Sequence, residues 1–156
     1  MKTITYKITR YSDKISKDEL EQGIKQGLRL WEKETDLRFK QVEHNQYLTI
    51  EFRKDDPMFS NGTITAFKHT LSESIIFNDR FYWSLDGKPI EIRNEFGHLI
   101  KVKTQNLPAI TAHEFGHVAG LLHTDNKEDL MYYPCEIVTN PSENDIQRIK
   151  RLIAVC

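Results

Sequence analysis

Residues 113–123 read HEFGHVAGLLH, and this stretch carries most of what the sequence says about fold and chemistry. On a helix, His113 and His117 are one turn apart and project from the same face, so both imidazoles can bind one tetrahedral metal ion. Glu114 directly follows the first histidine, which places its carboxylate beside the metal rather than on it. From there it can take a proton from a water molecule bound to the metal.

Gly120 is expected to end this helix, because glycine readily adopts positive φ values and lets the backbone turn sharply. After the turn, His123 can reach the same ion from outside the helix. Three protein ligands leave the fourth position of a tetrahedral zinc ion to water, which is typical of a catalytic site. The sequence therefore predicts zinc ligands at His113, His117 and His123, with Glu114 as the general base.

The alternative interpretation is an ordinary helix with structural histidines and a solvated or lysine-paired Glu114. A bare His-Glu-x-x-His arises often by chance. The longer pattern fixes three histidines, a glutamate and a glycine, and a chain of 156 residues should contain it by accident on the order of once in 100,000 sequences. We therefore favour the metal site.

The composition is typical of a globular domain: 38% of the residues are hydrophobic and 29% are charged. We expect a single domain over residues 1–156, long enough to bury a sizeable core. Twenty-two basic and 23 acidic residues leave a formal charge of −1, which favours neither nucleic acid nor an anionic membrane surface. No apolar run reaches membrane-spanning length. We expect a monomer that binds neither nucleic acid nor membranes.

The compartment is left open by the sequence. Residues 1–10 alternate like a strand and lack the continuous apolar core of a secretion signal, so either a leader has been removed or the protein is made without one. Cys135 and Cys156 are too few for a disulfide framework, although one bridge between them is possible.

Alternating apolar side chains predict strands, and helical spacing predicts a C-terminal helix. The predicted strands are 3–10, 37–42, 47–52, 63–68 and 74–78, with a further hairpin from 90–92 and 99–102, and the last helix is 144–155.

A long amphipathic helix is predicted over residues 17–34, with Ser16 as its N-cap. Gly23 and Gly27 lie one turn apart in it, which favours close packing on a sheet despite their cost in helix stability. Pro108 is expected to precede the helix of the zinc segment.

Further motifs support a family resemblance. Residues 130–132 read LMY, with Met131 eight residues after His123, and Thr124 follows that histidine. With these motifs and the zinc segment, the chain resembles the catalytic domain of the matrixins, the matrix-metalloprotease branch of the metzincins. The likeness extends to residues 4–11, 30–32, 37–39 and 145–149.

The resemblance implies a zinc-dependent endopeptidase with an α+β, zincin-like fold. That fold has a twisted five-stranded mixed sheet, a long N-terminal helix, an active-site helix, a Met-turn with Met131 beneath the metal, and a C-terminal helix. A protein or peptide substrate would lie extended along an edge strand at residues 63–68, and Ala109 would help to form a roomy pocket for an apolar side chain. Secretion is implied if a leader has been removed.

One departure from the family pattern concerns metals. Matrixins usually bind a structural zinc and calcium ions through a long loop, but here the matching connection is the short segment 68–73. The aligned ligand positions are Ile76, Asn78 and Phe81, which cannot bind those ions in that way. His69 is the one remaining candidate and is interpreted as a surface residue. We expect one catalytic zinc and neither structural zinc nor calcium.

Two other departures concern regulation and catalysis. The chain as given carries no inhibitory prosegment, so it should be active without processing; Cys135 could block the zinc, although a buried or bridged thiol fits better. Tyr133 stands two residues after Met131, where astacin-like metzincins carry a tyrosine that contacts the metal. Its phenol could stabilise an oxyanion, but we favour a role in the wall of the site.

Two other functions stay open. The chain could be a non-catalytic, protease-shaped binding module stabilised by zinc, although such a module would not need Glu114. It could also be a zinc hydrolase acting on cell-wall or other non-protein peptides, because fold alone does not decide the substrate.

Overall fold

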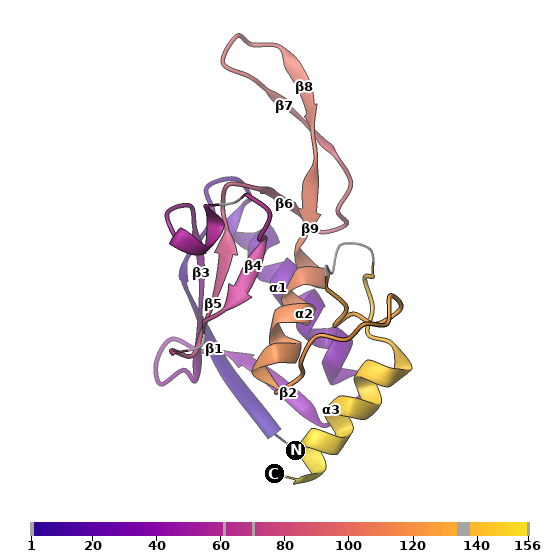
Figure 1. Ribbon diagram of the computed structural model, residues 1–156. Coiled ribbons are helices and arrows are strands. Elements are labelled where there is room, and N and C mark those ends of the chain that lie inside the picture. The colour runs from indigo at the N-terminus through magenta and orange to yellow at the C-terminus, as the bar shows by residue number, and fades with distance from the viewer. Residues whose placement is uncertain (1, 61, 70, 134–137, 156) are drawn as a thin grey trace.

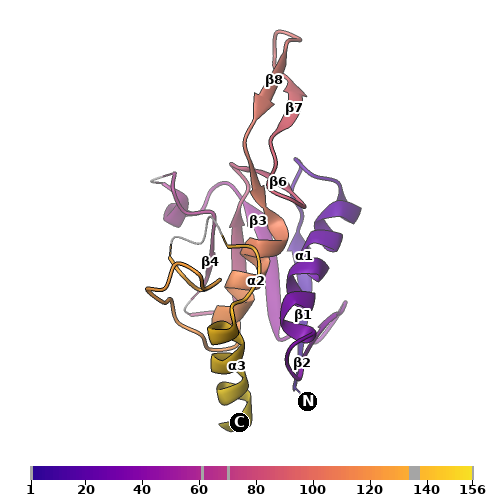
Figure 2. The same ribbon diagram turned by 90° about the vertical axis from the view of Figure 1, so that its right-hand side faces the viewer.

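The computed structural model describes residues 2–60, 62–69, 71–133 and 138–155. A five-stranded mixed sheet forms one layer, in the order β2-β1-β3-β5-β4, and helices α1 and α2 pack side by side against it (Figures 1 and 2). The helix α3 lies below α2 in both views. The three helices are α1 (Lys17–Glu32), α2 (Leu107–Val118) and α3 (Glu143–Val155). The predicted α+β fold is confirmed.

The sheet strands are β1 (Lys2–Arg10), β2 (Leu37–Gln41), β3 (Leu48–Arg53), β4 (Ala66–Lys68) and β5 (Ser74–Asn78). Neighbouring strands are parallel except β4, which runs antiparallel to β5 at the edge. The remaining elements are the short 3-10 helix η1 (Pro57–Phe59), the pair β6 (Tyr82–Ser84) and β9 (Thr104–Asn106), and the hairpin β7 (Ile90–Arg93) and β8 (Leu99–Val102).

The edge strand β4 is shorter than the predicted strand 63–68. The side chain of Asn78 explains the difference, because its Nδ2 donates to the carbonyl of Ile64 at 2.9 Å. Its backbone N–H donates to the carbonyl of Thr65 at 2.8 Å. Asn78 therefore holds the approach to β4 by a side-chain contact, and regular pairing begins only at Ala66.

The helix α1 begins as predicted, since the Ser16 side chain accepts a hydrogen bond from the backbone of Glu19. The expectation that Gly23 and Gly27 pack on the sheet is wrong: they face α2. A Cβ atom at Gly27 would lie 2.4 Å from the carbonyl oxygen of Pro108, and one at Gly23 would lie 2.7 Å from Leu107. The spacing of Gly23 and Gly27 shows that one face of α1 carries small residues, but it does not show which element packs against that face.

Pro108 lies inside the first turn of α2 rather than before it, and Asn106 caps the helix by accepting from the backbone of Ala109 at 3.0 Å. Proline is tolerated there because the first helical N–H groups have no partner within the helix. The helix therefore begins at Leu107, before Pro108 and not after it as predicted.

Aromatic side chains fix α2 against the other layers. The ring of Phe115 on α2 meets Tyr6 at 6.1 Å and Phe39 at 5.2 Å, both edge to face. From the other side, the Trp31 indole on α1 donates to the carbonyl of Ala112 at 2.8 Å. Strands and α1 thus hold the helix that carries the histidine motif. No described helix has both the length and the apolar character needed to cross a membrane.

Candidate metal centre

The helix α2 carries His113 and His117 on successive turns. It then ends, and the chain turns so that His123 approaches the other two histidines. Gly120 has a φ of +106°, its N–H donates to the carbonyl of His117 at 3.0 Å, and the N–H of Leu121 donates to that of Gly116 at 2.9 Å. These two bonds form the glycine-terminated helix end known as a Schellman motif. The prediction that Gly120 ends the helix with a positive φ is confirmed.

Backbone carbonyls orient the first two imidazoles. The Nδ1 atom of His113 lies 2.8 Å from the carbonyl oxygen of Leu130, and the Nδ1 atom of His117 lies 2.8 Å from that of Leu121. A carbonyl oxygen can only accept, so each Nδ1 carries the proton. Each Nε2 then has a free lone pair, which is the arrangement that metal-binding histidines use.

The three Nε2 atoms converge. Those of His113 and His117 lie 3.2 Å and 3.1 Å from Nε2 of His123. Zinc–nitrogen bonds of about 2.0–2.1 Å in tetrahedral geometry place ligand atoms about 3.3 Å apart, so the spacing fits zinc. One N–H of His123 can satisfy only one of the two acceptors well, whereas a cation at the meeting point satisfies all three. These histidines form the one group of three or more metal-ligating side chains found among the described residues.

The electrostatics keep these rings neutral. Burial lowers the pKa of His113 to about 4, despite its hydrogen bond to Leu130. Burial also lowers the pKa of His117 and His123, and for His117 the charges of His123 and Lys68 add to the effect. The neutral imidazole is the form that binds metal, so the ligands need not lose a proton near neutral pH.

Glu114 is buried, with 5% of its surface exposed, and its Oε2 atom has no hydrogen-bond partner among the described residues. Burial raises the pKa of this carboxyl to about 8. A cation held by the histidines would oppose that shift, because a nearby positive charge favours the carboxylate. A buried carboxyl without a partner is costly in a fold, and such groups are found more often at functional sites than elsewhere.

Met131 lies directly beneath the ligand helix. It is fully buried, and a Cβ atom at Gly116 would lie 2.5 Å from its Sδ atom, so the helix needs glycine there. The segment is held by two bonds: Thr124 N–H donates to the Met131 carbonyl at 3.0 Å, and Leu130 N–H donates to Asp145 Oδ2 at 2.6 Å. Asp145, on α3, thereby holds the backbone of Leu130, whose carbonyl oxygen orients the His113 ring.

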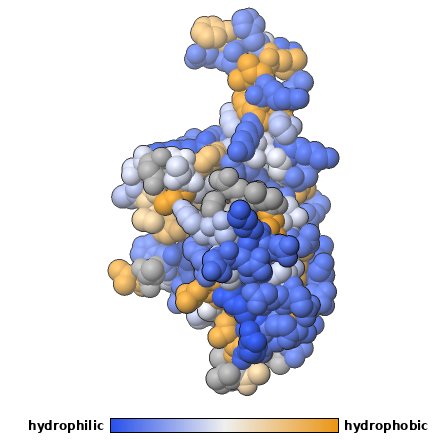
Figure 3. All heavy atoms as spheres, turned by 45° about the vertical axis from the view of Figure 1, so that its right-hand side comes forward, coloured by the Kyte–Doolittle hydropathy of each residue, from blue (hydrophilic) through white to orange (hydrophobic). Residues whose placement is uncertain are grey.

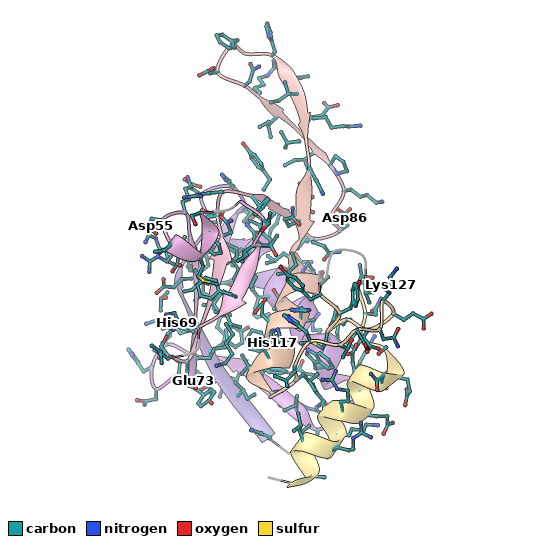
Figure 4. The ribbon with its side chains drawn as sticks, viewed as in Figure 1. Asp55, His69, Glu73, Asp86, His117 and Lys127 are labelled. Carbon is teal, nitrogen blue, oxygen red and sulfur yellow. The ribbon has the colours of Figure 1, made fainter. Side chains whose placement is uncertain are left out.

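A cleft of about 490 Å³ runs between β4 and the ligand residues. Its described lining is mostly apolar or hydroxyl-bearing around the histidines and Glu114, and the side chains include Ile64, Ala66, Phe67, Lys68, Leu121 and Leu122. Figure 4 marks His117 on α2 and, in the connection beyond β4, His69 and Glu73. Ala109 is buried and is not among the described lining residues, so its predicted role in a pocket gains no support.

Tyr133 lines this cleft, with 61% of its surface exposed, and its ring centroid lies 5.1 Å from that of His123. It is therefore close to the ligand set but not packed into the core. Cys135 and Cys156 fall outside the described residues.

The positions aligned with the family's second metal site have structural partners. Ile76 is buried in β5, and both polar atoms of the Asn78 side chain form hydrogen bonds with backbone groups. Phe81 is half-buried. His69 is half-buried, and its Nδ1 atom accepts from the N–H of Leu71 at 3.2 Å. The absence of structural zinc and calcium stays a prediction.

Comparison with known proteins agrees with the geometry. The family model described as matrixin matches residues 1–154. The chain belongs to the matrixin family. Interstitial collagenase B of Mus musculus is 29% identical over 96% of this matrixin, and stromelysin-1 of Equus caballus is 25% identical over 96%. Matrix metalloproteinase-27 of Homo sapiens is 26% identical over 96%.

These alignments cover 32%, 31% and 29% of the three relatives, so the matrixin chain spans about a third of their length. The family resemblance expected from the sequence is confirmed. The matrixin family uses zinc, and His113, His117 and His123 could bind such an ion.

Sequence reasoning missed the groups that orient the ligands. The carbonyls of Leu130 and Leu121 leave no signal in the side-chain pattern. The contact between Gly116 and Met131 and the bond from Leu130 to Asp145 join segments far apart in the chain. The sequence shows Gly116 inside the motif and Asp145 near the start of the last helix, but it does not show that they contact Met131 and Leu130.

Proposed function

We propose that this chain is a zinc-dependent endopeptidase whose metal ligands are His113, His117 and His123. The observation that carries the proposal is the convergence of three Nε2 atoms in a cleft beside the buried Glu114, whose Oε2 atom has no hydrogen-bond partner in the part of the chain that the structure describes. A zinc ion held by these three histidines would supply Lewis acidity, polarising a substrate carbonyl and lowering the pKa of a water molecule.

Glu114 acts as the general base. Its burial favours the protonated carboxyl and a nearby cation favours the carboxylate, so the group is poised to exchange a proton near neutral pH. It removes the proton from the attacking water and later delivers it to the amine that leaves. The hydrogen bonds of His113 and His117 to backbone carbonyls keep the ligand rings fixed while this proton moves.

The edge strand β4 supports an extended peptide as substrate. It pairs with β5 on one side and ends the sheet order, so its other edge can add a strand of bound peptide by main-chain hydrogen bonds. That edge borders the cleft that holds the histidines. A peptide in this position brings a carbonyl to the metal site.

A mixed peptide library tests the function. Cleavage is expected with the purified protein, loss of cleavage with a zinc chelator, and recovery when zinc is restored. The Glu114→Gln variant should retain zinc and lose cleavage by about 100-fold or more, because the proton acceptor is gone. Cleavage that survives in Glu114→Gln would contradict the assigned base. A protein that binds zinc and cuts no peptide would contradict the function.

A further inference from the structure

Lys68 occupies a distinctive place in the cleft. Side chains two apart on a strand share a face, so Lys68 points to the same side of β4 as Ala66, and both line the cleft. Helix α2 packs against β4 on this side and supplies the first two histidines. The lysine side chain is largely covered, with 23% of its surface exposed.

The ammonium of Lys68 is held only weakly by the protein. Its Nζ atom lies 3.7 Å from Oε2 of Glu73 and 3.5 Å from the carbonyl oxygen of His69. Both contacts are long, and the Glu73 side chain is 45% exposed. Such partly exposed pairs contribute little to stability, so a ligand carboxylate can replace Glu73 at small cost.

The cleft is otherwise poor in charge. Of the lining residues that the structure describes, Lys68 alone carries a permanent positive charge, and Glu114 alone carries a carboxyl group, which is buried. The other described lining residues, apart from the histidines, are apolar, hydroxyl-bearing or glycine. Lys68 is therefore the one permanent positive charge that a bound peptide meets among the described lining residues, and its partner Glu73 does not line the cleft.

We propose that Lys68 makes the cleft select peptides with an acidic side chain at the position beside the C-terminal end of β4. This inference rests on the proposed function only in taking a peptide as the ligand. A glutamate or aspartate there gains a charge-assisted contact with the ammonium, whereas a lysine or arginine is repelled. An exposed pair of this kind should change affinity by about two- to five-fold, and salt should weaken the effect.

The test uses peptides that share one cleavable core. Each carries a single Glu, Gln or Lys at one position, from four residues before the cut to four after it. Cleavage is measured with the zinc-loaded wild-type protein, and binding is measured by fluorescence anisotropy with zinc-loaded Glu114→Gln. Lys68→Met removes the charge, Lys68→Glu reverses it, and Lys101→Met removes a lysine from the exposed strand β8 as the matched control.

The expected result is one position at which Glu is favoured over Gln about two- to five-fold, with the preference lost in Lys68→Met and turned toward Lys in Lys68→Glu. The Lys101→Met control should keep the preference, and high salt should reduce it. A Glu preference that persists in Lys68→Met, or no preference at any position, overturns the inference.

The two proposals fail in different ways. Charge-selective binding without any cleavage would overturn the endopeptidase and leave the role of Lys68 standing. Zinc-dependent cleavage that is unaffected by substitution of Lys68 would support the endopeptidase and overturn the role of Lys68. If no peptide binds or is cut, both are overturned.

Discussion

The helix α2 and the β7–β8 hairpin are close in the chain, separated only by β9, but they are held in opposite ways. Helix α2 packs beside α1 and against the sheet, with Ala112 and Phe115 completely buried. The hairpin stands clear of the body, and its two strands pack chiefly on each other (Figures 1 and 3). Its tip exposes 74% of Phe96.

This contrast shows where long-range packing is needed. A metal site needs each of its ligand atoms held to within about 0.5 Å of its required position. The helix that carries His113 and His117 is accordingly fixed by contacts from α1 and from the sheet. The hairpin forms from local signals: the Asn94 side chain accepts from the N–H groups of Phe96 and His98 at 3.0 Å, and Gly97 has a φ of +79°. We therefore expect changes in α2 to affect the whole fold and changes in the hairpin to stay local.

A matched pair of phenylalanine substitutions should give the largest contrast. Phe115→Ala removes a fully buried ring that contacts Tyr6 and Phe39, and should lower the free energy of unfolding by about 3–5 kcal/mol. Phe96→Ala should change it by less than about 0.5 kcal/mol. Urea denaturation measures both, and equal losses would show that the hairpin is part of the same packed unit.

Glycine substitutions sharpen the same comparison. Gly27→Ala should cost about 3 kcal/mol, at the upper end for overpacking, because the new methyl group meets the backbone oxygen of Pro108. Gly97→Ala is strained by about 1 kcal/mol through its positive φ but meets no atom within 4 Å. If the hairpin opens independently of the rest of the fold, this strain should hardly change the free energy of global unfolding. A stable Gly27→Ala protein would contradict the close approach of α1 and α2.

The sequence predicted most of the fold because periodicity reports which face of an element is buried. It predicted β5 with the observed bounds and the hairpin with nearly the observed strands, since alternation and turn residues are local. It placed the glycine face of α1 against the wrong partner and overextended β4, because both depend on contacts with distant residues. The motif brought the three histidines to one point, but the carbonyls that orient two of them could not be read from side chains.

Protonation of the buried Asp129 should lower the free energy of unfolding in acid. Burial tends to raise the pKa of this carboxyl, but hydrogen bonds from Ser142 at 2.6 Å and Asn144 at 2.9 Å help to lower it overall. A folded pKa below the unfolded value of about 3.9 means that the stabilisation is present above about pH 4 and is lost as the pH falls further.

Urea denaturation between pH 3 and pH 6 would measure this effect, with the protein at a fixed ionic strength. Asp129→Asn should be less stable at pH 6 and should lose less stability on acidification. A variant whose stability falls as steeply as that of the wild type would exclude Asp129 as a source of the dependence.

The smallest effect is expected at Tyr133, in the wall of the cleft. Tyr133→Phe keeps the ring beside His123 and removes only the hydroxyl group. If Tyr133 is a wall residue, turnover should stay within about three-fold of the wild type with zinc retained. A loss of about 100-fold or more, as for a removed oxyanion donor, would instead assign the phenol to catalysis.

Zinc X-ray absorption spectroscopy of the purified protein would show directly whether His113, His117 and His123 bind one zinc ion. We expect one zinc per chain with three imidazole nitrogens at about 2.0–2.1 Å and one oxygen ligand completing the shell. A spectrum dominated by sulfur, or a shell unchanged when His123 is replaced by alanine, would contradict the account.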